Sequence, residues 1–251
     1  MARYRAQNIL GGQYTRIYDI STHETIEILN AKVKFVDDFL NTTIFTTTEH
    51  GPWLKKDTSA AGATFEDIVA DQSGGVMKLE LDEGQNEKEE AGIYFGDGLT
   101  FNLDKGVIFE ARAAIHTTPT LQSEIYFGLA NAYVEGPIAE ADAGPTVHAF
   151  FCFDGALTPT IHTDDASTDN NAIATGVTEV LDTYSIFRID ASDLTSVKFY
   201  IDGARVGSAT TFVMTNGANV VVQPFLMAHK ETSAGDGVIY CDYCKVWQLA
   251  R

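Results

Sequence analysis

Paired carboxylates are the residues most able to do chemistry in this sequence, because glycoside hydrolysis needs two of them about 5–10 Å apart. Alternate residues on a β-strand share a face and provide such spacing. Glu80 and Asp82 in MKLELDEG form the best pair, but they run into DEGQNEKEE, which is typical of a solvated edge. In FEARAAI, Glu110 is expected to form a structural ion pair with Arg112. We therefore predict no catalytic residues and a protein that is not an enzyme.

The three cysteines could in principle bind zinc or exchange a disulfide, since Cys241 and Cys244 have C-x-x-C spacing. They lie in GVIYCDYCKVWQ, which alternates like a strand. Residues three apart on a regular strand face opposite sides, so these two thiols are expected to diverge. No second Cys/His pair completes a zinc site. We interpret Cys152, Cys241 and Cys244 as buried structural thiols.

An oxygen-rich stretch, HTDDASTDNN, is the best candidate for binding a metal ion. Ca²⁺ takes six to eight oxygen ligands, and Asp164, Asp165 and Asp169 could contribute. The stretch does not reproduce the EF-hand spacing, and a polar hairpin loop is the simpler explanation for it. Calcium is thus the one cofactor that the sequence leaves open.

Aromatic residues could stack against a sugar ring. Candidates for this role are Trp53, Tyr133 and Tyr184, whereas Trp247 on the last predicted strand is expected to lie in the core.

The net charge is −18, with a sequence pI near 4.5. Such acidity disfavours binding to nucleic acid and to anionic membranes. Residues 1–18 differ, because they carry three arginines and no acidic residue. This leader lacks the apolar run of a secretory signal, and no stretch has the ~18 apolar residues of a membrane span. We expect synthesis in a reducing cytoplasm.

The elements that must position these residues are short β-strands. Runs rich in Val, Ile, Phe and Tyr, bounded by Gly, Asp, Asn, Ser or Pro, recur along the chain, as in GVIFEARAAI, SEIYFGLANAY and TVHAFFCFDG. This pattern predicts an all-β sandwich. Short helices are expected only in TFEDIVADQ and from His23 to Leu29. In SVKFYIDGARV the alternating strand and the Asp202-Gly203 turn predict a tight hairpin.

VKFYIDGARV resembles the hairpin of concanavalin A-like and laminin G-like domains. GGVMKLELD, GVIFEARAAI, EIYFGLANA and YCDYCKVWQ resemble other strands of that family in the same order. The resemblance is closest to versions found in virion proteins of tailed bacteriophages, including capsid decoration proteins. It implies a jelly roll of two antiparallel sheets over residues 35–251, preceded by an extension over residues 1–34.

The resemblance, the basic leader and the lack of catalytic residues together favour a structural virion protein that decorates the capsid surface. In this hypothesis the extension docks on the major capsid protein or on copies of the same chain, as a homotrimer or another homo-oligomer. The docking residues would be Arg3, Arg5, Tyr14, Arg16, Ile17 and Tyr18. The alternative is a lectin-like module on the virion or tail that binds glycans, with or without calcium.

Overall fold

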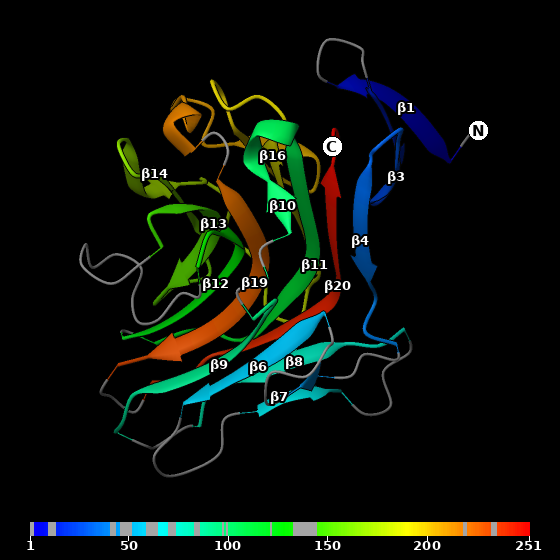
Figure 1. Cartoon of the computed structure of the whole chain (residues 1–251). Helices are drawn as coiled ribbons and strands as arrows, with labels where there is room; N and C mark the ends of the chain where they lie inside the picture. The colour runs from blue at the N-terminus through cyan, green and yellow to red at the C-terminus, as the bar shows by residue number, and fades with distance from the viewer. Residues whose placement is uncertain are drawn as a thin grey trace.

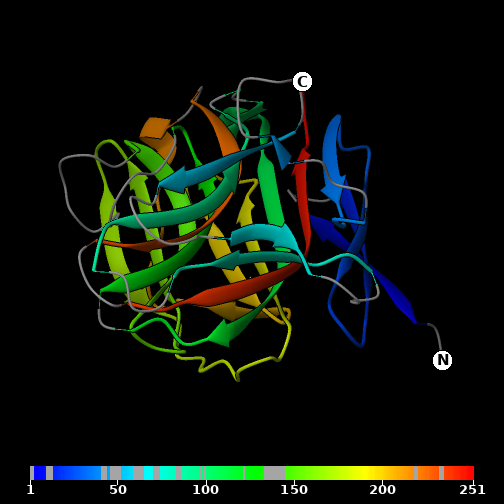
Figure 2. The ribbon, with the colours of Figure 1, turned by 90° about the horizontal axis from the view of Figure 1, so that it is seen from below.

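The computed structural model, shown in Figures 1 and 2, describes residues 3–9, 14–40, 44–45, 52–58, 65–69, 74–82, 86–96, 98, 100–120, 122–132, 145–217, 220–231 and 235–251. Their strands form two large sheets packed face to face and one small sheet beside them. This is the predicted all-β jelly-roll sandwich. Among the described residues, no helix has the length and apolar character needed to cross a lipid bilayer.

The larger sheet contains nine described strands, and we call it the nine-stranded sheet. In spatial order they are β15 (Asp169–Ala174), β14 (Thr160–Asp165), β13 (Val147–Asp154), β12 (Ser123–Ala130), β19 (Val221–Lys230), β9 (Glu89–Tyr94), β6 (Trp53–Thr58) and β5 (Ile44–Phe45), and β10 (Phe101–Asn102) also pairs with β19.

The second sheet contains eight described strands, and we call it the eight-stranded sheet. In spatial order they are β18 (Ala204–Val206), β17 (Lys198–Ile201), β16 (Ser185–Ala191), β11 (Val107–Thr117), β20 (Val238–Gln248), β8 (Met77–Glu80) and β7 (Phe65–Ile68), and β4 (Val33–Asp37) also pairs with β20.

The main core lies between the two large sheets and is rich in aromatic rings. Phe127 and Phe151 of the nine-stranded sheet meet Phe187 of the eight-stranded sheet edge to face, with centroids 5.0 and 5.2 Å apart. Phe199 adds a similar contact to Phe151 at 5.4 Å. Such pairs contribute about 0.5–1.5 kcal/mol each beyond the area they bury. Period-two alternation of apolar residues in both sheets therefore produces one shared interior.

The predicted hairpin is present as β17 and β18. Phe199 and Ile201 are buried in the core, whereas Lys198 and Tyr200 lie on the opposite, outer face of the sheet. The strand thus fills the core with one set of side chains and presents a polar set outside.

The turn between these strands contains Asp202 and Gly203, both with positive φ (47° and 76°). Two residues in this conformation make the tight turn that the right-handed twist of a hairpin favours. A Cβ added to Gly203 would lie 2.3 Å from Nδ1 of His23, so glycine also allows the hairpin tip to touch the N-terminal segment.

That segment forms a third sheet from β1 (Tyr4–Ile9), β2 (Tyr14–Asp19) and β3 (Thr25–Leu29), which we call the N-terminal sheet. In Figure 2 its blue strands lie on the outer side of β20, away from the main core. A small apolar cluster joins it to the eight-stranded sheet: Ile28, Ile108, Trp247 and Leu249. Residues 14–29 are therefore packed on the sandwich. The expected role of residues 1–34 as a docking extension separate from the sandwich stays a prediction.

Both predicted helices are wrong. Residues 65–68 form β7, and residues 25–29 form β3. In β3, Thr25 and Ile28 are both buried although they are three residues apart. The pairing with β2 shifts register there, because Ile17 lies opposite Glu27 while Tyr18 lies opposite Thr25. Because of this bulge, two residues of β3 that are three positions apart face the same side, as they would on a helix.

A second bulge corrects the prediction for the cysteines. Arg112 pairs with Tyr243 and the next residue, Ala113, pairs with Cys241, so Asp242 is the extra residue. Cys241 and Cys244 consequently share the core face instead of diverging. Both are free thiols and are buried, as is Cys152, and burial raises the pKa of each well above its usual value. The interpretation as buried thiols is confirmed.

Candidate functional site

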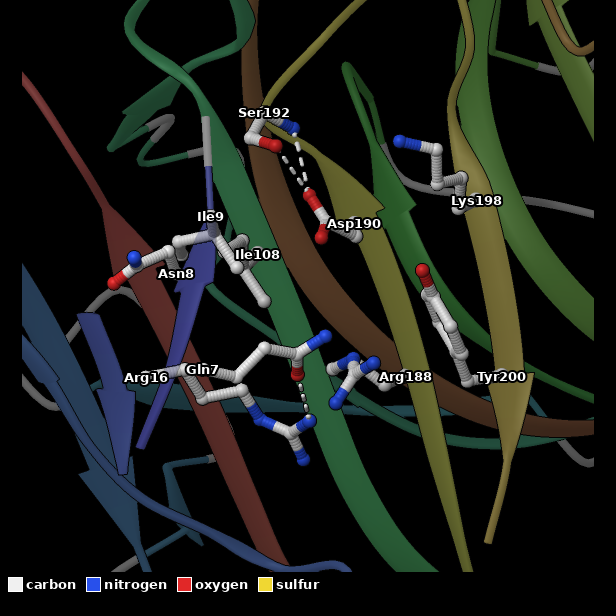
Figure 3. Close-up of a pocket in the computed structure, with 10 residues that line it drawn as sticks. All are labelled: Gln7, Asn8, Ile9, Arg16, Ile108, Arg188, Asp190, Ser192, Lys198 and Tyr200. Carbon is white, nitrogen blue, oxygen red and sulfur yellow. Dashed lines mark hydrogen bonds between the residues drawn. The ribbon is translucent and has the colours of Figure 1, made fainter. Parts of the chain in front are cut away.

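An open pocket of about 170 Å³ lies between the N-terminal sheet and the outer face of the eight-stranded sheet (Figure 3). Its lining residues come from β1, β2, β11, β16 and β17 and from the residues that follow β16. They are Gln7, Asn8, Ile9, Arg16, Ile108, Arg188, Asp190, Ser192, Lys198 and Tyr200. The volume is below the ~300–1,000 Å³ of sites for drug-sized ligands, so it fits a small molecule or one residue of a larger one.

The floor of the pocket is built from two rows of cross-strand neighbours on β11, β16 and β17. One row runs from Glu110 to Arg188 to Tyr200, of which Arg188 and Tyr200 line the pocket. The other runs from Ile108 to Asp190 to Lys198. Directly opposed side chains on one face of a sheet lie about 4.5–5.5 Å apart at Cβ, so strand register brings these polar groups together.

Arg16 forms part of the opposite wall and is 4% exposed. Its Nε donates to Thr25 Oγ1 at 2.8 Å, Nη2 donates to the His23 carbonyl at 2.7 Å, and Nη1 donates to Gln7 Oε1 at 3.4 Å. Burial, and then the neighbouring Arg188 cation, lower the pKa of Arg16 to about 10. The donors of Arg16 are thus used by hydrogen bonds within the N-terminal segment.

Arg188 is 6% exposed, and its Nε has no hydrogen-bond partner among the described residues. Its guanidinium lies over the ring of Tyr200, 4.0 Å from the centroid. Figure 3 shows the group between the Gln7 amide and the Tyr200 ring. Arg188 therefore offers unused donors inside the pocket.

Asp190 lies at the other end of the floor. Its Oδ1 accepts hydrogen bonds from the backbone N–H of Ser192 at 3.1 Å and from Ser192 Oγ at 2.6 Å. Lys198 projects nearby, and the Tyr200 hydroxyl is directed toward this end (Figure 3). Cationic donors thus stand at one end of the pocket, and a fixed carboxylate with a lysine stands at the other.

Glu110 lies under the N-terminal sheet and is completely buried. Its Oε1 accepts from the Thr25 N–H at 2.8 Å and from the Tyr243 hydroxyl at 3.2 Å. Its Oε2 accepts from the Thr25 hydroxyl and lies 3.8 Å from Nη2 of Arg16.

The predicted pairing of Glu110 with Arg112 is wrong. Arg112 instead donates to Asp242 at 2.6 Å. Two of the partners of Glu110, Thr25 and Arg16, come from the N-terminal sheet, which sequence spacing could not place above β11.

The predicted docking residues have unequal positions. Arg3 and Arg5 are exposed, and Arg3 pairs with Asp19 at 2.6 Å. Tyr14, Ile17 and Tyr18 are half-buried. Of these six residues, Arg16 is the one that lines the pocket.

The three aspartates predicted to bind calcium lie at the β14–β15 hairpin and have protein partners. Asp165 Oδ1 accepts from the N–H of Ser167 and of Thr168, and Oδ2 accepts from the N–H of Asn216 at 2.9 Å. The carboxylates of Asp164 and Asp169 accept from Ala166 N–H and from Asn171 Nδ2.

In the described part of the chain, no group of three or more His, Cys, Asp or Glu side chains is arranged to hold a metal ion. Calcium binding at Asp164, Asp165 and Asp169 stays a prediction.

The other carboxylate candidates are half-buried at the end of β8. Glu80 accepts from Lys78, and Asp82 has its own partners within the chain. They lie outside the pocket lining.

The predicted stacking residues do not gather in one place. Trp53 is fully buried and donates to Asp37 at 2.8 Å, and Tyr184 lies under the Arg112 guanidinium. Tyr133 lies outside the described residues. Trp247 is buried as predicted, but against the N-terminal sheet.

The outer face of the nine-stranded sheet also carries aromatic residues. Tyr126, Phe150 and Phe225 form a cluster there, and each is at most 2% exposed. These rings are therefore not an exposed platform for stacking, and the pocket beside the N-terminal sheet is the better candidate site.

Comparisons with solved structures agree on the fold. A protein of unknown function from Shewanella oneidensis is 13% identical, with a TM-score of 0.58 and coverage of 92% of this chain and 93% of that one. The potassium-bound carbohydrate recognition domain of Emp46p is 12% identical, with a TM-score of 0.53 and coverage of 84% and 95%. An endo-β-1,4-glucuronan lyase from Trichoderma reesei is 14% identical, with a TM-score of 0.52 and coverage of 85% and 94%.

No protein-family model matches the sequence, and no curated protein sequence matches it. At these identities the likeness establishes the fold alone: a concanavalin A-like jelly roll of the kind found in carbohydrate recognition domains.

Sequence reasoning missed most of the pocket. Arg188, Asp190, Lys198 and Tyr200 all occupy outward positions of strands that were predicted correctly. The alternation in FRID and KFYI was a usable signal, because each outward position carries a polar or aromatic side chain. The pocket could not be predicted because the sequence does not give the strand order, and it is this order that makes these residues neighbours.

Proposed function

We propose that this protein is a carbohydrate-binding, lectin-like module and that the pocket beside the N-terminal sheet is its binding site. The observation that carries the proposal is the lining of that pocket. Amide, hydroxyl, carboxylate and guanidinium groups surround it together with one aromatic ring, that of Tyr200. A few fixed polar groups around a small cavity are typical of sites that select a polar small molecule.

Structures that share the fold support this proposal only at the level of architecture. They include a carbohydrate recognition domain and a polysaccharide lyase. The fold hosts many activities, so we infer sugar binding from the side chains of the pocket.

We propose binding without glycoside hydrolysis. A glycosidase of the usual kind needs two carboxyl groups flanking the bond. Asp190 is the one carboxylate among the described residues that line the pocket. Glu110 is nearby in the sheet, but its oxygens are held by Thr25, Tyr243 and Arg16.

A glycan array probed with the full chain, followed by calorimetry on the best ligand, tests the proposal. Tyr200→Ala should weaken binding at least ~10-fold, since it removes the ring and the packing of Arg188. Tyr4→Ala is the matched control, because Tyr4 is 52% exposed and does not line the pocket. Absence of any glycan ligand, or equal affinities for both variants and the wild type, would reject this site.

Attachment to a bacteriophage capsid is a second candidate, which the exposed strand β1 favours. Five of its six residues are exposed, and it forms an edge of the N-terminal sheet among the described strands. An edge strand can pair with another chain, here the major capsid protein or a second copy in a homo-oligomer. Mass spectrometry of purified phage particles should then find the protein in many copies, and its absence from them would exclude the decoration role.

A further inference from the structure

We infer that the pocket binds an acidic sugar, with the sugar carboxylate on Arg188 and ring hydroxyls on Asp190. This inference rests on the proposed function and specifies the chemical class of its ligand. The observation that supports it is that Arg188 at one end of the pocket and Asp190 at the other both keep polar atoms without a partner among the described residues.

The first of these charges is Arg188. An isolated buried cation is costly unless it is paired and hydrogen-bonded. Arg188 is 94% buried, yet it forms no ion pair with a carboxylate within the part of the chain that the structure describes. The Tyr200 ring packs on the guanidinium, with its centroid 4.0 Å away. A planar guanidinium can pair with a carboxylate through two parallel hydrogen bonds, so a ligand carboxylate is a suitable partner for Arg188.

The carboxylate on the neighbouring strand does not fill that role. Glu110 lies directly opposite Arg188 in the pairing of β11 with β16. Both of its oxygens are already committed to Thr25, Tyr243 and Arg16. Glu110 is thus engaged by Thr25, Tyr243 and Arg16, and among the described residues no carboxylate is left to pair with Arg188, as a ligand carboxylate could.

The opposite end of the pocket selects against a simple inorganic anion. Asp190 has one oxygen held by Ser192, and its second oxygen, Oδ2, faces no donor among the described residues. A carboxylate repels phosphate or sulfate but accepts hydrogen bonds from hydroxyl groups. Lys198 beside it also lacks an ion pair within the described chain and adds positive potential for the same ligand.

A ligand with one carboxylate and several hydroxyls satisfies both ends. The protein as a whole carries a charge of −18, which opposes the approach of dense polyanions such as nucleic acid. A uronic acid residue, with a single charge and a ring of hydroxyls, meets both conditions.

Calorimetric titration of the full chain with methyl β-D-glucuronide and with methyl β-D-glucoside tests this inference. The two probes differ only at C6, where the glucuronide has a carboxylate and the glucoside has a hydroxymethyl group. The glucuronide should bind about 10–100-fold more tightly, as expected for a charge-assisted pair. Arg188→Gln should abolish that preference. Arg205→Gln is the matched control, since Arg205 is exposed and does not line the pocket, and it should keep the preference.

Lys198→Gln provides a second variant that leaves the buried arginine intact, and it should reduce the glucuronide affinity by a few-fold. Equal binding of both sugars, unchanged by Arg188→Gln, would overturn the acidic ligand but keep the sugar site. Binding of neither sugar in this pocket would overturn both proposals. Inorganic phosphate that competes as well as the glucuronide would show an anion site without sugar recognition, which also contradicts the inference.

Discussion

Glu110 is the residue on which the attachment of the N-terminal sheet depends most. Its carboxylate is fully buried and accepts hydrogen bonds from Thr25 on β3 and from Tyr243 on β20. Arg16 brings the compensating positive charge. One side chain thus links the sandwich to the sheet that forms a wall of the pocket.

Glu110→Ala should lower the free energy of unfolding by about 3–5 kcal/mol, because it leaves the Arg16 charge buried without a counter-ion. Urea unfolding measures the loss. Glu27→Ala is the matched control, since Glu27 pairs with Lys34 at 2.7 Å in a partly exposed position, and surface pairs contribute about 0–1 kcal/mol. Equal losses in the two variants would contradict the anchoring role of Glu110.

His162 should make stability depend on pH. Burial lowers its pKa to about 4 from an ordinary value of 6.5. Between those values the unfolded chain binds a proton that the folded chain does not, so stability is lost as the pH falls. From pH 7 to pH 5 we expect a loss of about 2 kcal/mol from this residue.

His162→Gln should remove that part of the slope in urea unfolding measured at several pH values. His148, whose pKa burial also lowers, should keep a smaller slope of the same sign. The exposed His116 provides the control His116→Gln. A slope for His162→Gln that matches the wild type would disprove the assignment.

The β17–β18 hairpin shows where sequence patterns are sufficient to predict structure, whereas β3 and β20 show where they are not. The hairpin of β17 and β18 was predictable because its alternation is regular and its turn is Asp202-Gly203. The bulges opposite Tyr18 and at Asp242 were not, since they depend on the partner strand. The bulge in β3 led to the wrong prediction of a helix there. The bulge in β20 led to the wrong prediction that Cys241 and Cys244 diverge.

Strand β3 also holds the N-terminal sheet through apolar packing. Ile28 is fully buried against Ile108 and Trp247, whereas Ile26 on the same strand is 48% exposed. Ile28→Ala should therefore cost about 2–5 kcal/mol of unfolding free energy, and Ile26→Ala about 0.5 kcal/mol or less. Comparable urea midpoints for both variants would show that β3 is not packed in this way.

The molecule as a whole combines an acidic surface with a small cationic pocket under its N-terminal sheet. The sandwich itself was predictable from composition and alternation. The site was not, because it joins β1 and β2 to β11, β16 and β17, and only the three-dimensional arrangement brings Gln7 and Arg16 next to Arg188 and Asp190. Of the residues predicted from sequence to bind a partner, Arg16 alone lines it.

The claim that this arrangement is a sugar-binding site is tested most directly by a crystal structure of the full chain grown with saturating methyl β-D-glucuronide. We expect the sugar between β1 and the β16–β17 pair, with its carboxylate on Arg188 and a hydroxyl on Asp190. A sugar seated instead on the outer face of the nine-stranded sheet, or an empty pocket at saturation, would contradict the claim.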